Sequence, residues 1–333
     1  MKSISQRCKE AIDIFRKDGG VAFLKRLIMY LEHTLHNLSK KMRRVQIQYK
    51  QQGKWPADEP LVSVIIPCYN YGNFIIGAIE SVLAQTYKRF EILVINDGST
   101  DLFTLNVLKN LSNAKVKVFH QKNQGLAQTR NNGAMMAAGK YLCYLDPDDL
   151  FEPTYLEMTL SLLESDESLG SCYSWVHCFG EFDSIWKTQD LDPYLLRQRT
   201  TAPSQSVIRK QAWQSVKEWN GSGFLTKYDG YFEDWVFWID MVQCGYRGQV
   251  IPEPLIRYRV HKASLGATHK PGWKTMLPVL HADRRAFFFD RSYRKKIEKQ
   301  LSKRIYVENN HINLYPSSSN ETHNNPTLMV RKY

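Results

Sequence analysis

The feature that most constrains the fold is a regular alternation of β-branched and helical segments over residues 61–146. The sequence pattern predicts strands at 61–67, 90–97, 115–120 and 140–146, with a helical segment after each of the first three. Strands and helices that alternate at this spacing form βαβ units, which build a parallel sheet. We therefore predict an α/β fold with a central, mostly parallel sheet that is flanked by helices.

Polar residues follow the predicted strands, at the sheet edge where ligands bind in folds of this class. Residues 141–145 form an apolar strand that leads directly into Asp146, Asp148 and Asp149. Carboxylates packed together repel one another and raise each other's pKa. Because a divalent cation with oxygen ligands removes this repulsion, we predict a metal and diphosphate site here. For Asp149 alone, we favour a role as cap of the helix that starts near Pro153.

The second half of the chain is less regular. The pattern predicts a helix at 153–165, a strand at 169–179, and a strand that leads into a helix at 202–216. Residues 183–199 are expected to be a mobile segment or an excursion from the fold. A helix is predicted at 231–245, two short strands at 247–261, and a long helical stretch at about 273–304.

Charge divides the chain unevenly. Residues 1–55 carry thirteen Lys and Arg against four acids, so +9 of the net charge of +12 lies there. Their apolar residues recur at helical spacing, which fits either an amphipathic helix on an anionic membrane surface or a helical hairpin packed on the main domain. We predict an extension at 1–55, a linker at 56–60, a main domain at 61–265, a helical segment at 266–308, and a disordered tail at 309–333.

Composition excludes several classes of protein. A hydrophobic fraction of 43% in 333 residues supports a full globular core, and no apolar run reaches the length of a membrane span. The charged start is unlike a secretory signal, and the six scattered cysteines predict reduced core thiols in a cytoplasmic protein. Zinc is not expected. No nucleic-acid-binding module is visible, so we expect no nucleic-acid partner.

Five motifs, in order and with their spacing, resemble those of glycosyltransferase family 2. They cover about residues 61–265, within which the nucleotide-sugar half is 61–150 and the acceptor half 151–265. The resemblance implies a GT-A fold and an inverting, nucleotide-sugar-dependent transfer. The five motifs are VSVIIPCYNYGNFIIGAIESVLAQTY, FEILVINDGSTD, NQGLAQTRNNGAMMAAGKYLCYLDPDD, FEDWVFW and YRVHKAS.

The resemblance also implies roles for the residues of these motifs. Asp146 and Asp148 match the DXD motif, in which Asp148 binds Mg²⁺ or Mn²⁺ and Asp146 contacts the ribose or the metal. His261 matches a histidine that reaches the metal or diphosphate in some members; the alternative is a structural histidine. Asp234 matches the catalytic base, and Glu233 orients the acceptor or holds the loop.

For the nucleotide, the resemblance implies contacts from Pro67, Tyr69 and Asn70 in the first loop. Asp97 is expected to bind a uracil-type base, with an Asx-turn as the alternative. Arg130 is expected near the diphosphate, because a guanidinium suits phosphate oxygens. The alternatives for Arg130 are a solvated helix arginine or a clamp on Asp97 or Asp146.

Trp235 and Trp238 are expected in the core, with stacking on the acceptor as the alternative for Trp235. The predicted function is metal-dependent transfer of one sugar, from a UDP- or dTDP-sugar, to a glycan or lipid-linked glycan acceptor in surface polysaccharide or glycolipid assembly. The protein is expected in the cytoplasm, with residues 1–55 as a peripheral membrane contact. The alternative is a non-catalytic protein of the same fold that binds a nucleotide sugar or serves as a scaffold.

Overall fold

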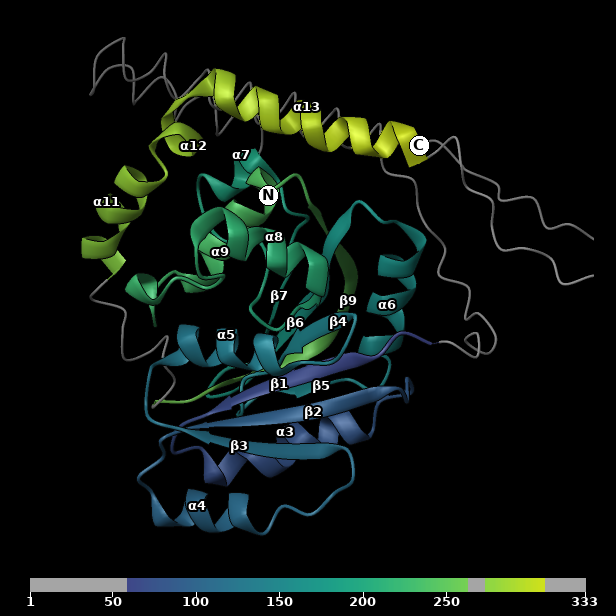
Figure 1. Cartoon of the computed structure of the whole chain (residues 1–333), viewed down its shortest axis with the longest axis vertical. Helices are drawn as coiled ribbons and strands as arrows, with labels where there is room; N and C mark the ends of the chain where they lie inside the picture. Colours follow the sequence, from purple (N-terminus) through teal and green to yellow (C-terminus); the bar gives the residue numbers. More distant parts are fainter. Residues whose placement is uncertain (1–58, 263–272, 309–333) are drawn as a thin grey trace, which may run out of the picture. The chain divides into compact units, whose positions relative to one another are not determined.

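A computed structural model describes residues 59–262 and 273–308 (Figure 1). The predicted basic extension at 1–55 and the tail at 309–333 lie outside the described residues, as does most of the predicted linker. The described ranges form a mixed α/β structure around one nine-stranded sheet. Strands β3-β2-β1-β4-β8-β6-β9-β5 follow one another across this sheet, and β7 pairs with β6.

The first half of the sheet is parallel, as the alternation predicts. Strand β1 pairs with β2 on one side and β4 on the other, and β2 pairs with β3. Helix α5 lies on one side of these strands, with α3 and α4 on the other (Figure 1). The elements are β1 (Val62–Cys68), α3 (Gly72–Leu83), β2 (Phe90–Asp97), α4 (Leu102–Lys109), β3 (Val116–Gln121), α5 (Leu126–Met136) and β4 (Tyr141–Tyr144).

Close packing of α5 depends on Gly133. A Cβ atom at this position would collide with the side chain of Ile65 in β1 and come close to Ile95 in β2. Both isoleucines are fully buried, so the helix approaches the sheet only because this residue has no side chain. This contact fixes how closely α5, the helix that carries Arg130, packs on the sheet.

The second half of the sheet is mixed. Strand β8 runs antiparallel to β4 and β6, whereas β6 and β9 run parallel. The elements here are β5 (Leu150–Phe151), α6 (Tyr155–Ser165), β6 (Leu169–Gly180), β7 (Ser184–Trp186), α7 (Pro193–Leu196), β8 (Val207–Arg209), α8 (Lys210–Asn220), η1 (Thr226–Tyr228), α9 (Glu233–Gln243) and β9 (Arg247–Val260).

One prediction for this half was wrong. Residues 247–260 form one long strand, β9, and not two, because the register against β6 shifts between Ser174 and Val176 and thereby accommodates Pro252 and Pro254. Residues 183–199, which were expected to be a mobile segment or an excursion from the fold, contain β7 and the short helix α7, which Asp192 caps. Leu195 and Leu196 of α7 are buried, which explains why the segment packs down.

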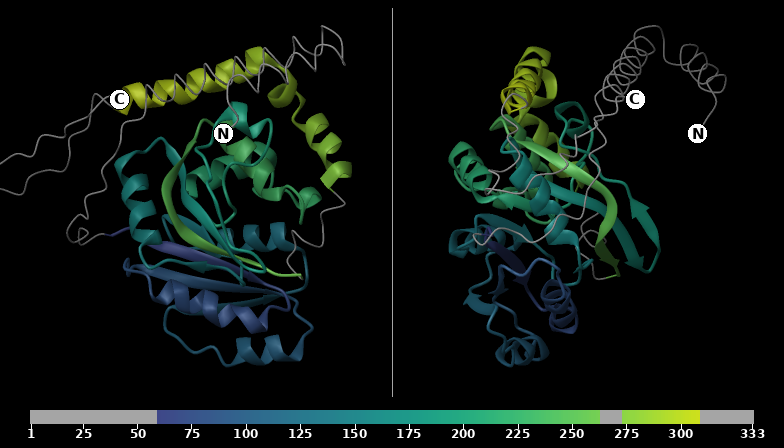
Figure 2. Two further views of the ribbon diagram at one scale, coloured as in Figure 1. Left: turned by 180° about the vertical axis from the view of Figure 1, so that it is seen from behind. Right: turned by 90° about the vertical axis from the view of Figure 1, so that its right-hand side faces the viewer.

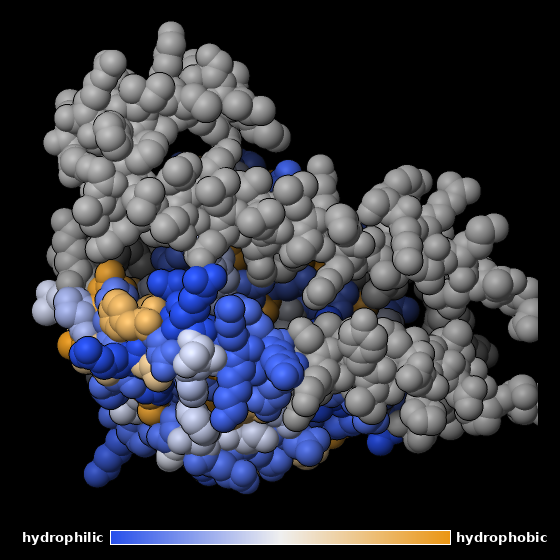
Figure 3. Space-filling model, turned by 90° about the horizontal axis from the view of Figure 1, so that it is seen from above, coloured by the Kyte–Doolittle hydropathy of each residue, from blue (hydrophilic) through white to orange (hydrophobic). Residues whose placement is uncertain are grey.

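After the gap at 263–272 the chain is helical, with α11 (Trp273–Asp283), α12 (Arg285–Phe289) and α13 (Arg291–Glu308). Two further views show these helices beside α9 and at the opposite end of the sheet from α3 and α4 (Figure 2). Seen from above, the described surface is mostly hydrophilic, with a small hydrophobic group at one side (Figure 3). Within residues 59–262 and 273–308, no helix has the length and apolar character needed to span a membrane.

Candidate active site

Asp146 follows β4, and both of its carboxylate oxygens accept hydrogen bonds. Its Oδ1 accepts a hydrogen bond from Nη2 of Arg130 at 2.8 Å. Its Oδ2 accepts from Nε2 of Gln205 at 3.1 Å and from Oγ of Ser204 at 3.4 Å. The donors come from α5 and from the segment before β8, so this carboxylate is held from two sides while remaining partly exposed.

Asp148 is paired with His261. Its Oδ2 lies 2.9 Å from Nε2 of the imidazole, which is one residue beyond the end of β9. Burial is the main cause that raises the pKa of Asp148, and the charge of Asp146 adds to it, while His261 lowers it. The rings of Tyr71 and Phe74 lie beside the imidazole, at 6.2 and 5.2 Å between ring centroids.

The predicted role of Asp149 as a helix cap was wrong. Helix α6 begins after Thr154 and has no side-chain cap. Asp149 is instead fully buried, where it accepts hydrogen bonds from the backbone nitrogen of Arg259 at 2.8 Å and from Nε2 of Gln205. Burial and the neighbouring charges of Asp148 and Asp146 raise its pKa well above the usual range. This carboxylate therefore ties β9 to the segment that carries the other two acids.

Arg130 joins the two halves of the site. The guanidinium is 1% exposed and binds Asp146 through Nη2 and Glu233 through Nη1, at 2.8 and 3.0 Å. Of the alternatives given for Arg130, the clamp on Asp146 matches this contact. The other, a solvated helix arginine, is wrong because the side chain is buried. A role at the diphosphate stays a prediction.

Glu233 and Asp234 form the first turn of α9, where the helix dipole favours negative charge. Burial, followed by the charge of Asp234, raises the pKa of Glu233 to about 7. Burial also raises the pKa of Asp234, against the effect of Arg130. Asp234 is partly exposed, and its Oδ1 accepts a hydrogen bond from the backbone nitrogen of Trp235 at 2.7 Å. Glu233 is buried against Arg130, so it holds the loop in this structure.

Asp97 is almost fully buried at the end of β2 and holds a loop. Its carboxylate accepts from the backbone nitrogens of Gln124 and Gly125 at 2.8 and 2.9 Å, and from Nε2 of Gln121 at 2.7 Å. The side chain of its neighbour Asn96 closes the following turn, where its Oδ1 accepts a hydrogen bond from the backbone nitrogen of Ser99, three residues on, at 3.0 Å. Base recognition by Asp97 stays a prediction.

The same loop is fixed from its other side by Asp229, which sequence reasoning missed. Its two oxygens accept from the backbone nitrogens of Leu126 and Ala127, at 3.0 and 2.8 Å, at the start of α5. Gly125 has φ of 84°, and a Cβ atom there would collide with this carboxylate. Only glycine fits both requirements. A lone Asp about a hundred residues away carries no local signal for such a role.

The first predicted nucleotide loop lies beside Ser99. Pro67 is buried near the end of β1, and Tyr69 is 44% exposed. Asn70 has φ of 60°, and its Oδ1 accepts from the backbone nitrogens of Thr100 and Asp101 at 2.9 and 3.0 Å. Asn70 thus joins the loops after β1 and β2, which the sequence could not show.

Trp235 and Trp238 are core residues, as expected. They are 7% and 0% exposed, and Nε1 of Trp235 donates to the backbone oxygen of Leu196 at 2.8 Å. The alternative that Trp235 stacks on an acceptor was wrong, because its ring is covered by α7 and by Phe288 of α12.

The chemistry of the donor set fits a divalent cation that the substrate helps to bind. In the described ranges no group of three or more His, Cys, Asp or Glu is arranged as a metal site. Asp148 and His261 supply an adjacent carboxylate and imidazole, and Mg²⁺ sites commonly use one or two carboxylates together with phosphate oxygens. Asp146 is occupied by Arg130 and Gln205, so it is a weaker candidate than Asp148.

Comparisons with known proteins relate the chain to glycosyltransferases. The family model described as Glycosyl transferase family 2 matches residues 63–218. An uncharacterized glycosyltransferase of Haemophilus influenzae is 30% identical over 220 residues, which cover 61% of this chain and 66% of that protein. One of Rickettsia felis is 46% identical over 114 residues, which cover 34% of this chain. This match spans only 19% of the Rickettsia protein's length.

The fold is also found among solved structures. The crystal structure of Staphylococcus aureus TarS residues 1–349, in complex with UDP-GlcNAc, aligns with a TM-score of 0.57 at 16% identity. The alignment covers 74% of this chain and 72% of that one. At this identity the likeness concerns the fold, which is the GT-A fold.

Proposed function

The chain belongs to glycosyltransferase family 2, and from this premise we propose that it transfers one sugar from a nucleoside-diphosphate sugar to an acceptor hydroxyl with inversion. A UDP- or dTDP-sugar is the favoured donor; the TarS structure with the same fold contains UDP-GlcNAc. The proposed acceptor is a glycan or lipid-linked glycan of a surface polysaccharide or glycolipid pathway.

One observation carries this proposal: a single buried guanidinium connects the acids after β4 with the acids at the start of α9. Arg130 contacts Asp146 on one side and Glu233 on the other, and Asp234 is the next residue. Donor and acceptor chemistry need to be adjacent, because the acceptor oxygen attacks the sugar carbon that the diphosphate leaves. This arrangement supports a transferase more strongly than a scaffold.

Asp234 is the proposed base. It takes the proton of the acceptor hydroxyl while the acceptor oxygen bonds to the anomeric carbon, and the bond from that carbon to the diphosphate oxygen breaks. The pKa of this carboxylate is raised by burial, which brings it closer to neutral pH and makes it a better base. Its partial exposure leaves it accessible to an acceptor.

Asp148 and His261 are the residues that would hold Mg²⁺ or Mn²⁺, which supplies positive charge to the leaving diphosphate when bound. The residues of this chain do the rest. Arg130 keeps Asp146 and Glu233 in place, and Gln205 fixes the second oxygen of Asp146. Asp149 holds β9, and thus His261, next to Asp148.

Hydrolysis of the donor tests the proposal without knowledge of the acceptor. We expect wild-type protein with Mn²⁺ to release nucleoside diphosphate from at least one member of a panel of UDP- and dTDP-sugars. Asp148→Ala and Asp234→Asn are each expected to lower the rate by about 10²–10⁴-fold, the range for loss of a general base or a charge-stabilising group. Release is measured by chromatography of the nucleotides.

Glu218→Gln is the matched control, because this carboxylate is exposed on α8 and contacts none of the site residues. It is expected to keep wild-type rates. If the donor binds in calorimetry but is never turned over, the scaffold alternative replaces the transferase. If Asp148→Ala and Asp234→Asn turn over the donor like wild type, the site assignment is wrong.

A further inference from the structure

Among the described residues, two arginines form hydrogen bonds with the acids after β4 and at the start of α9, which we call the acid cluster. Arg130 is 1% exposed, and its Nη1 and Nη2 donate to Glu233 and Asp146 at 3.0 and 2.8 Å. Its guanidinium therefore has almost no surface for a ligand. Arg259 is the second arginine, at the end of β9, and it is partly exposed. The members of the acid cluster are Asp146, Asp148, Asp149, Glu233 and Asp234.

Two hydrogen bonds join Arg259 to the acid cluster. Its backbone nitrogen donates to Oδ1 of Asp149 at 2.8 Å, and its side-chain Nε donates to the backbone oxygen of Asp148 at 3.0 Å. The carboxylate of Asp148 is paired with His261 at 2.9 Å. The guanidinium of Arg259 is therefore held directly beside Asp148, the residue proposed to bind the divalent cation, by a backbone contact.

Two aromatic rings hold the guanidinium in place. Cζ of Arg259 lies 5.2 Å from the ring centroid of Phe74 in α3 and 4.5 Å from that of Phe179 in β6. Phe179 is opposite Arg259 in the pairing of β6 with β9, which explains the close approach. A planar guanidinium packs well on aromatic faces. The side chain is thus positioned before any ligand binds.

The two terminal nitrogens of this guanidinium are unused. Within residues 59–262 and 273–308, neither Nη1 nor Nη2 of Arg259 has a hydrogen bond or an ion pair with the protein. A guanidinium offers its N–H donors as a fork, which matches two oxygens of one anion. Because Nε and the two rings already immobilise the side chain, binding such an anion costs little conformational entropy.

The chemistry of the donor indicates which anion binds. A terminal phosphate carries a charge of about −1.5 to −2 at pH 7, and the inner phosphate of a nucleoside diphosphate adds to it. A divalent cation that is bound to the carboxylate of Asp148 has part of its charge already balanced. A second positive group beside Asp148 is therefore needed to match the diphosphate, and Arg259 is in that place.

We propose that Arg259 binds the diphosphate of the donor through Nη1 and Nη2, a role that the resemblance gave to Arg130. The inference rests on the proposed function and adds a binding residue to its donor site. Arg130 keeps the carboxylates of Asp146 and Glu233 in place, whereas Arg259 contacts the substrate.

Arg257 provides the matched control. It lies two residues before Arg259, on the same face of β9, and its Cζ is 4.7 Å from the ring centroid of the same Phe179. Its Nε lies 3.8 Å from the carboxylate of Glu152, which is outside the acid cluster. The two arginines thus share their strand, charge and aromatic neighbour, and they differ in the contact with Asp148.

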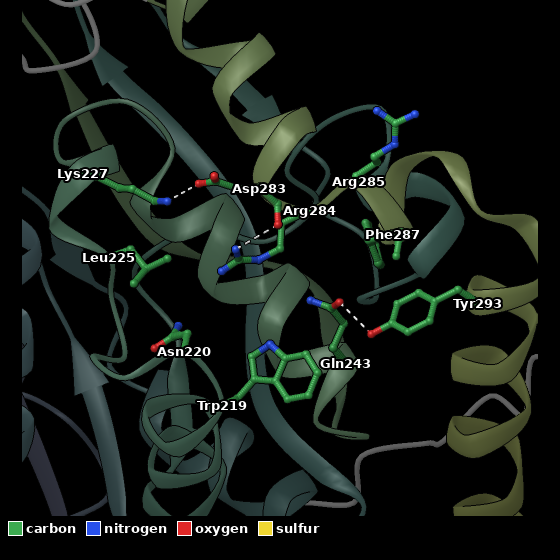
Figure 4. A pocket seen from close by; sticks show the side chains of 11 residues that line it. Trp219, Asn220, Leu225, Lys227, Gln243, Asp283, Arg284, Arg285, Phe287 and Tyr293 are labelled. Carbon is green, nitrogen blue, oxygen red and sulfur yellow. Dashed lines mark hydrogen bonds and ion pairs between the residues drawn. The ribbon is translucent and has the colours of Figure 1, made fainter.

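A second control lies near the other end of α9. Arg285 lines a hollow of about 450 Å³ between α8, α9 and the C-terminal helices (Figure 4). Lys227 and Asp283 in the same hollow are paired with each other, and none of the lining residues belongs to the acid cluster. Replacing Arg285 therefore removes an exposed positive charge without touching the donor site.

Calorimetry of nucleotide binding tests the assignment without turnover. The full chain is titrated with UDP and with dTDP in the presence of Mn²⁺, and the affinities for uridine and thymidine are measured by ligand-observed NMR. Arg259→Met is expected to raise Kd for the diphosphate that binds wild type about tenfold or more, the range for loss of a hydrogen bond to a charged group. Methionine fills the space between the two rings, so Kd for the matching nucleoside should stay within about twofold.

Arg259→Lys is expected to fall between wild type and Arg259→Met, because lysine keeps the charge and loses the planar fork. Arg257→Met and Arg285→Met should keep Kd for the diphosphate within about twofold, as for exposed charges without a direct contact.

The proposal is overturned if Arg259→Met binds the diphosphate like wild type, or if either control variant weakens this binding equally. It is also overturned if Arg259→Met weakens the nucleoside as strongly as the diphosphate, since the side chain then only shapes the pocket. Failure of wild type to bind UDP and dTDP overturns it too. If wild type binds a diphosphate but hydrolyses no donor, the proposed function fails, whereas the calorimetric comparison still decides on Arg259.

Discussion

The two ends of helix α9 both bury carboxylates, yet they neutralise them differently. Near its C-terminal end, Asp240 is 0% exposed and accepts two hydrogen bonds at 2.7 Å from the guanidinium of Arg284. Nδ2 of Asn220 and Nε2 of Gln243 donate to it as well, at 2.9 and 3.1 Å. The charge of this carboxylate is thus balanced by one cation, and its oxygens are fully hydrogen-bonded within the protein.

At the N-terminal end of α9 the charges do not balance. Arg130 and His261 face a group of carboxylates whose remaining partners are neutral donors. The pKa values of four of these acids are raised, mainly by burial. The acids are Asp146, Asp148, Asp149, Glu233 and Asp234.

The difference in charge balance distinguishes a structural carboxylate, at the C-terminal end of α9, from carboxylates that can bind a ligand, at its N-terminal end. A buried carboxylate with a matched cation holds helices together, and nothing else is needed to complete it. An acid group with too little positive charge is neutralised by protons, as the raised pKa values indicate, or by a bound cation. Three experiments test this contrast, beginning with the largest expected effect.

Breaking the Asp240–Arg284 pair near the C-terminal end of α9 should lower the free energy of unfolding and leave donor hydrolysis unchanged. Asp240→Ala leaves the guanidinium of Arg284 with its charge unpaired at a site where it is 14% exposed. Loss of one partner of a buried pair costs about 3–5 kcal/mol of unfolding free energy. Urea unfolding followed by circular dichroism measures this loss, and donor hydrolysis at a temperature where the variant is folded is expected at the wild-type rate.

Arg130→Met is the matched variant at the N-terminal end, since it also removes one partner of a buried contact. Here we expect hydrolysis to fall together with stability, because Asp146 and Glu233 lose their common partner. The contrast between the two ends is wrong if Asp240→Ala lowers the hydrolysis rate of folded protein as much as Arg130→Met does.

The pH dependence of stability should come from the N-terminal end. The pKa of Glu233 is about 7 in the folded protein, against a usual value of 4.5, so the folded state holds this proton more tightly than the unfolded state. Its contribution to stability is therefore complete below about pH 4.5 and is lost as pH rises through 7. The difference in pKa of about 2.5 corresponds to about 3 kcal/mol.

Glu233→Gln is expected to flatten the fall in unfolding free energy between pH 4.5 and 7, since the amide does not titrate and still accepts from Arg130. Urea unfolding at steps of pH gives the slope. Asp240→Asn serves as the control, in which the slope should persist. An unchanged slope in Glu233→Gln would assign the titration to another acid.

Adding a divalent cation should stabilise the N-terminal end of α9, where the acids lack positive charge, and leave the Asp240–Arg284 pair unaffected. At about ten times its Kd, Mn²⁺ contributes about 1.4 kcal/mol, which raises Tm by roughly 3–5 °C for a domain of this size. The rise is expected to be larger at pH 8 than at pH 5, because the raised pKa of Asp148 keeps more of this carboxylate protonated at the lower pH. His261→Ala should reduce the rise and Asp240→Asn should not, as measured by thermal shift.

The parallel half of the fold was predictable because each βαβ unit carries its own local signal. Consecutive residues show the β-branched pattern of a strand or the periodicity of an amphipathic helix. The polar residues that follow parallel strands must then meet at one edge of the sheet. Asp146, Asp148 and Asp97 could be found for this reason. The family motifs then extended the prediction to Asp234 and His261, which no local pattern would have joined to the first half.

The parts of the fold and of the candidate site that the sequence did not predict depend on contacts between segments far apart in the chain. Gln205 holds Asp146 and Asp149 from 59 and 56 residues away, and Asp229 caps α5 from 103 residues away. Glutamine and aspartate are common on surfaces, so their identity does not reveal such roles. The single strand β9 was missed because its two prolines argue against a strand until the bulges against β6 are seen.

The shared guanidinium of Arg130 has a consequence for how this protein can evolve or be engineered. A change at position 146 alters the charge felt at position 233, although the two carboxylates do not touch, so substitutions at these positions are expected to be epistatic. Under the proposed roles of the two carboxylates, donor preference and acceptor preference are therefore expected to be coupled traits. We therefore expect a library that varies positions 130, 146 and 233 together to reach combinations that separate variation of the two halves misses.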